Sequence, residues 1–148
     1  CTPGQIQRYL SKISGPLLDR IDIQCEISPL PFKDLSKAEQ GETSANIRER
    51  VLKAHSIQTE RFKNYPNIHC NAHMSERMIH EFAEPDEQSL EILRKAMESL
   101  KLSARAYNRI LKVARTIADI DASTKVQAYH IAEAIGYRSL DRGDWGER

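Results

Sequence analysis

Three basic residues on one predicted helix have the spacing to hold a phosphate group. Arg105, Arg109 and Lys112 recur at helical intervals, so they share the face opposite to the apolar side chains of that helix. Arg105 lies in the first turn after Ser103, where unpaired backbone amides and the helix dipole favour an anion. An ordinary solvated face of a helical bundle would give the same pattern, so both interpretations stay open.

Arg20 is a second candidate for binding a phosphate. It lies between the leucine pair at 17–18 and Ile21, and we expect these apolar neighbours to be buried and to hold it rigidly. A guanidinium that is fixed in this way can bind a phosphate on a partner surface. The alternative is that Asp19 or Asp22 neutralises Arg20 in an ordinary ion pair.

The elements that must position these arginines are mostly helices. The alternation of apolar and polar residues over 21–27 predicts one strand with a buried face, and a lone strand needs a sheet to be stable. In the long helix over 43–64, Ile47, Val51, Ala54 and Phe62 share the face that we expect to be buried. The predicted helices cover residues 3–13, 43–64, 75–83, 86–101, 103–121 and 127–137.

Changes in composition along the chain predict four segments. Residues 1–32 would form the end of an α/β unit, and 33–42 would be a linker, because the stretch over 28–42 contains two prolines, a glycine and many charges. Residues 43–138 would form a helical domain, because their helices alternate apolar and charged faces. Residues 139–148 would be a loose tail.

Charge and composition exclude several classes of protein. The 148 residues contain 22 Lys and Arg against 21 Asp and Glu, so the surface as a whole is not polybasic. Residues 94–115 contain seven basic residues and one acid, Glu98, which predicts a local positive patch. No apolar run approaches the roughly 18 residues that span a membrane, so we expect no membrane partner.

The cysteines and histidines do not predict a metal site or a disulfide framework. Cys1, Cys25 and Cys70 are odd in number and widely spaced, which is typical of a protein in the reducing cytoplasm. The cluster over 69–73, with His80 nearby, lacks the paired spacing of a structural zinc site, so we expect no metal.

Two long motifs resemble one family of ATPases. The stretch ISGPLLDRIDI at residues 13–23 is similar to a hallmark of the magnesium-chelatase-like AAA+ ATPases, and most similar to their ComM (YifB) branch. The stretch LSARAYNRILKVARTIAD at 102–119 resembles the second signature of the same family, and HIAEAI at 130–135 fits its usual ending. The resemblance covers nearly the whole chain in the right order.

The resemblance implies a mainly α fold, in which a helical AAA+ lid follows a short helix–strand remnant of the α/β AAA+ core. It implies that Arg20 is an arginine finger, which reaches the ATP of a neighbouring subunit in trans, and that Arg105 is the sensor-2 residue of the lid. We expect Arg105 and Arg109 to contact the nucleotide. Cys1 resembles the last member of a cysteine cluster that the family carries before this stretch.

We expect this chain to be the C-terminal part of a longer ATPase, because it starts without Met and has no Gly-x-x-x-x-Gly-Lys-[Ser/Thr] phosphate loop. ATP and magnesium would bind to the full-length protein. The chain alone should be inactive and should hold no cofactor tightly.

The resemblance also implies partners and a task. Identical subunits would form a ring, expected to be a hexamer, in the cytoplasm, and the motor would act on DNA in branch migration during natural transformation. Two alternatives stay open. One is a magnesium-chelatase motor subunit that drives metal insertion into a porphyrin. The other is a helical interaction module without a nucleotide role, in which ion pairs within the chain would occupy Arg20 and Arg105.

Overall fold

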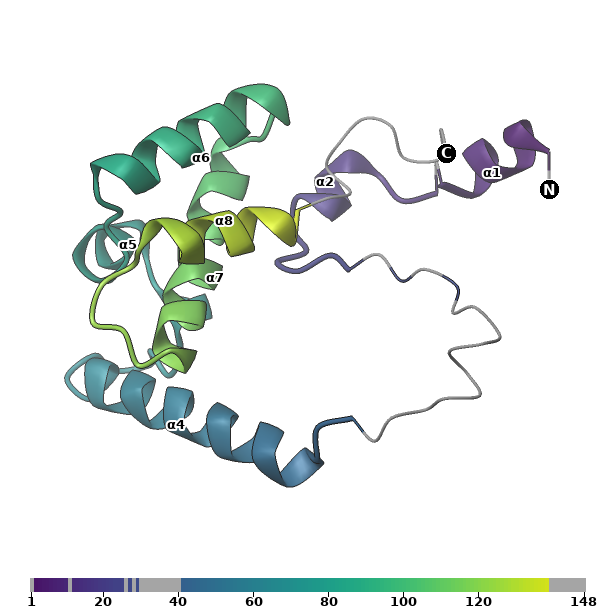
Figure 1. The fold of residues 1–148 in the computed structure, drawn as a ribbon. Coiled ribbons are helices and arrows are strands. Elements are labelled where there is room, and N and C mark those ends of the chain that lie inside the picture. The colour runs from purple at the N-terminus through teal and green to yellow at the C-terminus, as the bar shows by residue number, and fades with distance from the viewer. Residues whose placement is uncertain (1, 11, 26, 28, 30–40, 139–148) are drawn as a thin grey trace.

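The computed structural model describes residues 2–10, 12–25, 27, 29 and 41–138, and it confirms a mainly helical fold (Figure 1). Two short helices lie near the N-terminus, and a bundle of longer helices follows residue 41. In chain order the elements are α1 (Pro3–Leu10), α2 (Gly15–Leu18), α4 (Ser44–Phe62), the 3₁₀ helix η1 (Asn71–His73), α5 (Glu76–Phe82), α6 (Glu87–Ser99), α7 (Ala104–Ile120) and α8 (Ala128–Gly136).

Helix α7 is the centre of the bundle. It packs against α8, α4, α5 and η1, and α6 packs against α8 (Figure 1). The helix presents a stripe of small and branched apolar side chains at the spacing of one helical face, which lets neighbouring helices approach closely. The buried members of this stripe are Ala106, Ile110, Leu111, Ala114 and Ala118.

Side-chain caps fix where the helices of the bundle begin. In each case a hydroxyl or carboxylate accepts a hydrogen bond from the backbone N–H three residues later, which satisfies one of the free amides of the first turn. The capping residues are Thr43 for α4, Ser75 for α5, Asp86 for α6 and Ser103 for α7.

Helices α6 and α7 end on a residue with left-handed backbone geometry that is not glycine. After α7, Ala122 has φ 53°, and the N–H of Ser123 donates to the carbonyl of Ala118 over 2.8 Å. Lys101 has φ 51° at the same position after α6. This arrangement closes the last turn, although a Cβ atom makes left-handed geometry costly.

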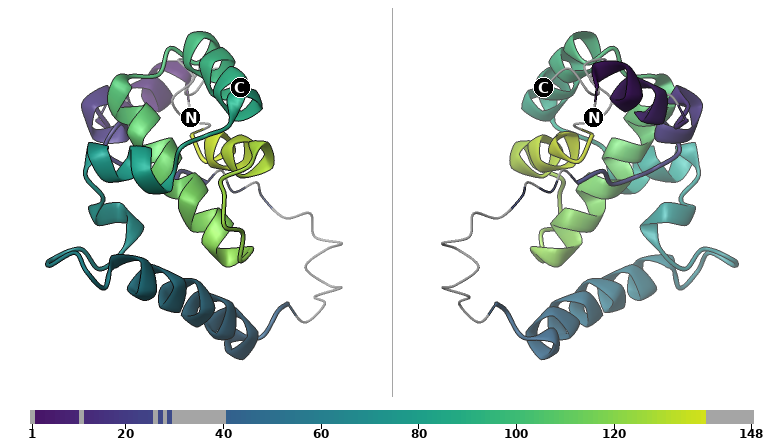
Figure 2. Two further views of the ribbon diagram at one scale, coloured as in Figure 1. Left: turned by 90° about the vertical axis from the view of Figure 1, so that its left-hand side faces the viewer. Right: turned by 90° about the vertical axis from the view of Figure 1, so that its right-hand side faces the viewer.

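The first half of α4 departs from the sequence prediction. Ala54 and Phe62 are buried as expected, but Ile47 and Val51 are 43 % and 56 % exposed. The N-terminal turns of α4 lie apart from the other helices (Figures 1 and 2), which agrees with the exposure of these side chains. The prediction of one continuous buried face therefore holds only for the second half of α4.

The predicted strand over 21–27 is wrong for the part of the segment that the structure describes. Residues 21–25 have no regular secondary structure, and Ile23 and Ile27 are largely exposed. No other strand occurs among the described residues, so the segment has no neighbour with which to pair. Its backbone contacts the bundle instead, because the N–H of Gln24 donates to the carbonyl of Tyr137 over 2.8 Å.

Most of the predicted linker and the whole predicted tail lie outside the described residues, as does Cys1. Of the helices in the described ranges, none is long and apolar enough to cross a membrane.

Candidate phosphate-binding site

The first turn of α7 presents Arg105 to solvent. Ser103 caps the helix by accepting a hydrogen bond from the N–H of Ala106 over 3.2 Å, and this fixes the direction of the first turn. Arg105 is exposed, and it has no hydrogen-bond or ion-pair partner among the residues that the structure describes. Its guanidinium is therefore available to an external anion beside the positive end of the helix dipole.

The structure brings the three predicted basic residues to one small cavity of about 250 Å³. The cavity lies between the N-terminal half of α7 and the segment that follows α2, and it contains three cations and one carboxylate. Its lining residues are Asp22, Ala72, Arg105, Asn108, Arg109 and Lys112. The sequence predicted that Arg105, Arg109 and Lys112 share a face, but it did not predict that Asp22 joins them.

Asp22 is the counter-ion of this cavity. It forms an ion pair with Arg109, so the charge of Arg109 is partly compensated in this structure. Lys112 donates a hydrogen bond to the carbonyl of Ala72 over 2.8 Å. Burial and the nearby charge of Arg109 lower the pKa of Lys112, and the carboxylate of Asp22 acts in the opposite direction. The cavity keeps an excess of positive charge.

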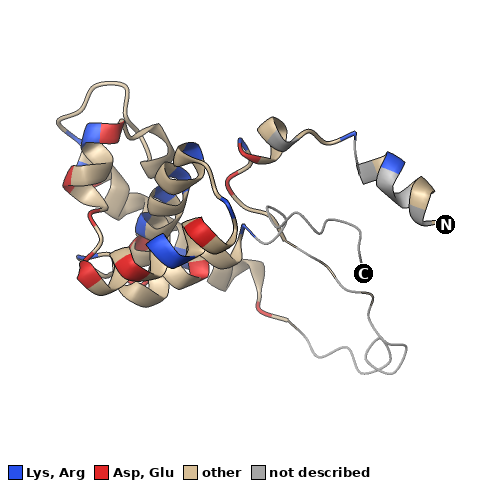
Figure 3. Ribbon diagram, turned by 90° about the horizontal axis from the view of Figure 1, so that it is seen from above, with Lys and Arg blue, Asp and Glu red and all other residues tan. Residues whose placement is uncertain are grey.

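The positive patch is narrower than residues 94–115 suggested. Arg94 on α6 forms ion pairs with Glu91 and Glu98, and Arg115 is buried against Asp119. Acidic and basic residues are interleaved over the helices (Figure 3). Counting charges along the chain missed these partners, because two of the three acids lie outside the basic stretch. The cations at the start of α7 remain as the candidate site.

Arg20 follows α2 and is exposed. Its Nη1 atom donates to the carbonyl of Pro16 over 3.4 Å, which is a long hydrogen bond. No ion pair joins it to Asp19 or Asp22 in the structure. Asp22 pairs with Arg109 instead, and the Asp19 carboxylate lies 3.8 Å from Arg138. Arg20 and Arg105 are therefore both without a carboxylate partner in the described part of the chain.

The apolar residues that flank Arg20 are less buried than expected, although Leu18 is half-buried. Leu17 and Ile21 are 47 % and 38 % exposed, because the described residues contain no sheet to cover them. The turn that carries Arg20 is held by polar contacts with the end of α8 instead. In particular, Arg138 donates a hydrogen bond to the carbonyl of Ile21.

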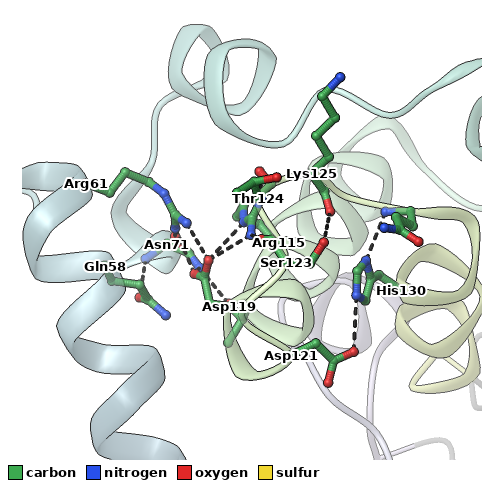
Figure 4. A network of polar contacts seen from close by, with 12 residues as sticks. Gln58, Arg61, Asn71, Arg115, Asp119, Asp121, Ser123, Thr124, Lys125 and His130 are labelled. Carbon is green, nitrogen blue, oxygen red and sulfur yellow. Dashed lines mark hydrogen bonds and ion pairs between the residues drawn. The ribbon is translucent and has the colours of Figure 1, made fainter.

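A buried polar network surrounds Asp119 near the C-terminal end of α7, and the sequence analysis did not predict it (Figure 4). The Asp119 carboxylate accepts hydrogen bonds from Arg61, Arg115 and Asn71, and Gln58 accepts one from the backbone of Asn71. These contacts join α4 and η1 to α7. One feature of the sequence could have indicated this network. Arg115 and Asp119 are four residues apart and lie beside the apolar stripe of the helix, which favours an ion pair between them inside the bundle.

The histidine- and cysteine-containing loop over 69–73 does not form a ligand cluster in the structure. The rings of His69 and His73 lie edge to face with centroids 6.2 Å apart, and Cys70 is a free thiol. Within the described ranges, no three His, Cys, Asp or Glu residues are grouped so that they could hold a metal ion.

The sequence that forms the helical bundle matches a known protein family. The family described as "Magnesium chelatase, subunit ChlI C-terminal" matches residues 41–138, and "Magnesium chelatase, subunit ChlI" matches residues 1–35. The chain therefore belongs to the magnesium chelatase ChlI C-terminal family.

Its similarity to individual proteins points to one branch of that family. The chain is 43 % identical over 142 residues to the competence protein ComM of Haemophilus influenzae, a match that covers 95 % of this chain. It is 42 % identical over 143 residues, or 96 % of the chain, to the uncharacterized protein YifB of Escherichia coli. It is 31 % identical over 138 residues, or 93 % of the chain, to the uncharacterized protein Rv2897c of Mycobacterium tuberculosis.

Each of these matches covers 27 % of the relative's own length. The chain thus spans about a quarter of the relatives that it matches. It is consistent with a segment of a protein of the ComM branch.

Proposed function

We propose that this chain is the C-terminal part of an AAA+ ATPase of the ComM type, a ring motor that acts on DNA. In this proposal Arg20 is the arginine finger for the ATP of the neighbouring subunit, and Arg105 is the sensor-2 residue of the helical lid. One observation carries the proposal. Both side chains are exposed and lack a carboxylate partner in the described structure, and Arg105 also lines the cavity with Arg109 and Lys112. Arg48 and Arg77 are likewise exposed without an ion pair among the described residues, but neither lines that cavity.

The chemistry of phosphoryl transfer supports these roles. The transferred phosphoryl group carries concentrated negative charge, and a positioned arginine accelerates transfer by about 10³ to 10⁵ in systems with an arginine finger. An arginine that is already paired with a carboxylate would have to break that pair first. Arg20 and Arg105 avoid this cost, while Arg109 would have to leave Asp22 before it could contact a phosphate.

ATP and magnesium would be held by another part of the proposed parent ATPase, because this sequence has no phosphate-loop motif. ATP bound there supplies the phosphoryl group. The residues of this chain would bind and orient its phosphates. Arg105 would do so from the positive end of α7, and Arg20 would act from the adjacent subunit of a ring.

DNA as the substrate is supported by the name of a relative, the competence protein ComM of Haemophilus influenzae. On this basis we propose branch migration during natural transformation as the task. The description of the matching family favours a second candidate, a magnesium-chelatase motor subunit. Stimulation of ATP hydrolysis by branched DNA, compared with stimulation by a porphyrin together with magnesium, separates the two.

The first prediction concerns the two arginines in the full-length parent. Arg20→Ala should leave ATP binding nearly intact and lower the rate of hydrolysis by about 10³-fold, because the charge is needed as the phosphoryl group transfers. Arg105→Ala should also impair hydrolysis and weaken nucleotide-driven closure of the lid. Arg94→Ala is the matched control: it removes an exposed arginine that lies outside the cavity and should change neither quantity.

Mixing subunits tests whether Arg20 acts in trans. Arg20→Ala subunits are combined with subunits that have a disabled phosphate loop and an intact Arg20. If the finger acts across the subunit boundary, mixed rings contain some intact sites and part of the activity returns. If mixed rings form and no activity returns, the role assigned to Arg20 is wrong.

A further inference from the structure

We propose that Arg138 is a positioning residue for Arg20, which holds the turn at residues 19–24 against the C-terminal end of α8. This inference rests on the proposed function, because it takes Arg20 to be the arginine finger. It assigns a separate role to Arg138, whose guanidinium would act on the backbone beside the finger and not on the phosphate.

The environment of Arg138 carries the proposal. Arg138 follows α8 within two residues and has an exposed fraction of 0 %. Its Nη1 atom donates a hydrogen bond to the carbonyl of Ile21, and its Nη2 atom lies 3.8 Å from the carboxylate of Asp19. Arg138 therefore contacts the residues on both sides of Arg20.

Two further contacts fix the same turn. The N–H of Gln24 donates to the carbonyl of Tyr137 over 2.8 Å, and the carboxylate of Asp22 forms an ion pair with Arg109 on α7. The turn is thus joined to the bundle at residues 19, 21, 22 and 24. Arg20 stays exposed between these points, and within the described ranges its side chain is hydrogen-bonded only to the carbonyl of Pro16 in the preceding helix.

Burial makes the contacts of the Arg138 guanidinium with the turn favourable. A buried cation is tolerated only where hydrogen bonds and an opposite charge compensate it. The turn supplies both, through the carbonyl of Ile21 and the carboxylate of Asp19. The apolar side chains at 17 and 21 are only partly buried, with exposed fractions of 47 % and 38 %, so they hold the turn less firmly than fully buried side chains would. Any displacement of α8 would therefore move Arg20 with it, which couples the position of the lid to the position of the finger.

Hydrogen exchange at the Gln24 amide measures directly, in this chain, how firmly the turn at residues 19–24 is held against the end of α8. Arg138→Met removes the guanidinium and its charge and keeps an unbranched side chain about as long as the aliphatic stem of arginine. We expect it to speed exchange at Gln24 at least tenfold while the amides of α7 stay protected. Arg138→Lys should restore part of the protection. Ile79→Val is the control, because it trims the core on α5 and leaves the turn untouched.

ATP hydrolysis by the full-length parent measures the consequence for Arg20. We expect Arg138→Met to lower kcat towards the level of Arg20→Ala with little change in KM, and Arg138→Lys to recover part of kcat. A role in stability alone would leave kcat per folded subunit unchanged, as expected for Ile79→Val. If Arg138→Met does not fold, Asp19→Asn removes the charge opposite Arg138 and should produce the same effects on a smaller scale.

The outcomes separate this inference from the proposed function. If Arg20→Ala abolishes hydrolysis but neither the folded Arg138 variants nor Asp19→Asn change kcat or exchange at Gln24, the positioning role is wrong and the finger stands. If Arg20→Ala has no effect in assembled rings, the finger assignment fails, and the positioning role fails with it, whatever exchange at Gln24 shows of the contact itself.

Discussion

The carboxylate of Asp119 compensates the charge of two arginines inside the bundle. Its side chain is fully buried, and it is the shared partner of Arg61 on α4 and Arg115 on α7. Two guanidinium groups thus rely on one carboxylate, with Asn71 as a further donor to it. Removing this carboxylate would leave two nearly buried cations without a counter-ion, and such cations are far more costly than an exposed broken pair.

We predict that Asp119→Asn lowers the free energy of unfolding by about 3–5 kcal/mol, the range found when one member of a buried ion pair is removed. Urea unfolding followed by helical circular dichroism measures the change. Glu98→Gln is the control, because it neutralises an exposed carboxylate paired with Arg94 and should leave stability nearly unchanged. Equal effects of the two substitutions would contradict a special role for the buried carboxylate.

At the scale of elements, the sequence predicts the helices of the bundle well because their signals are local. Ser75, Asp86 and Ser103 cap helices at the predicted positions, and the apolar spacing of α7 identifies its buried face. The predictions that fail concern features that depend on residues far away in the sequence. A strand pattern at 21–27 has no sheet to join, and the exposed first half of α4 has no covering helix among the described residues.

The candidate site follows the same rule. That Arg105, Arg109 and Lys112 share one helical face follows from their spacing alone. The ion pair between Asp22 and Arg109 and the contact between Arg138 and Ile21 each join residues that are far apart in the sequence, and nothing in the local pattern indicates them.

Near the C-terminal ends of α7 and α8, we expect an alanine-to-glycine and a glycine-to-alanine substitution both to raise the stability of the protein. Ala122→Gly should raise the free energy of unfolding by about 1 kcal/mol, because the left-handed geometry there penalises a Cβ atom. Gly136→Ala should also raise it, by about 0.5–1 kcal/mol, because this helical position has open space for a Cβ atom. Thermal unfolding of both variants tests this. A loss of stability in Ala122→Gly would show that its backbone geometry has been misassigned.

At the scale of the whole molecule, the helical bundle should fold without the N-terminal segment. A chain that lacks residues 1–32 keeps the apolar core, whose members all lie between residues 62 and 134. It loses the partners of Arg138 on the turn, so we expect it to be less stable by roughly 1–3 kcal/mol, the cost of unsatisfied buried polar groups. Limited proteolysis and thermal unfolding are the measurements. Complete unfolding of the shortened chain would place the domain boundary elsewhere.

Combining the deletion of residues 1–32 with Arg138→Met tests whether Arg138 is the reason for the expected loss of stability. If the N-terminal segment stabilises the bundle through Arg138, deleting residues 1–32 in the Arg138→Met background should cost measurably less than in the unmodified chain. Equal costs in both backgrounds would mean that the segment acts through other contacts.

The hydrogen bond between Gln24 and Tyr137 closes residues 24–137, which include the helical bundle, into one loop of chain, because it joins the end of the turn to the residue that follows α8. A unit whose two ends touch can be spliced into a host protein at one point without forcing the host's own ends apart. Grafting residues 24–137 between members of the family would thus require a match at a single junction, formed by the turn and the residues after α8. Recombination in evolution would meet the same low geometric barrier, so a lid of this design can be exchanged as one cassette.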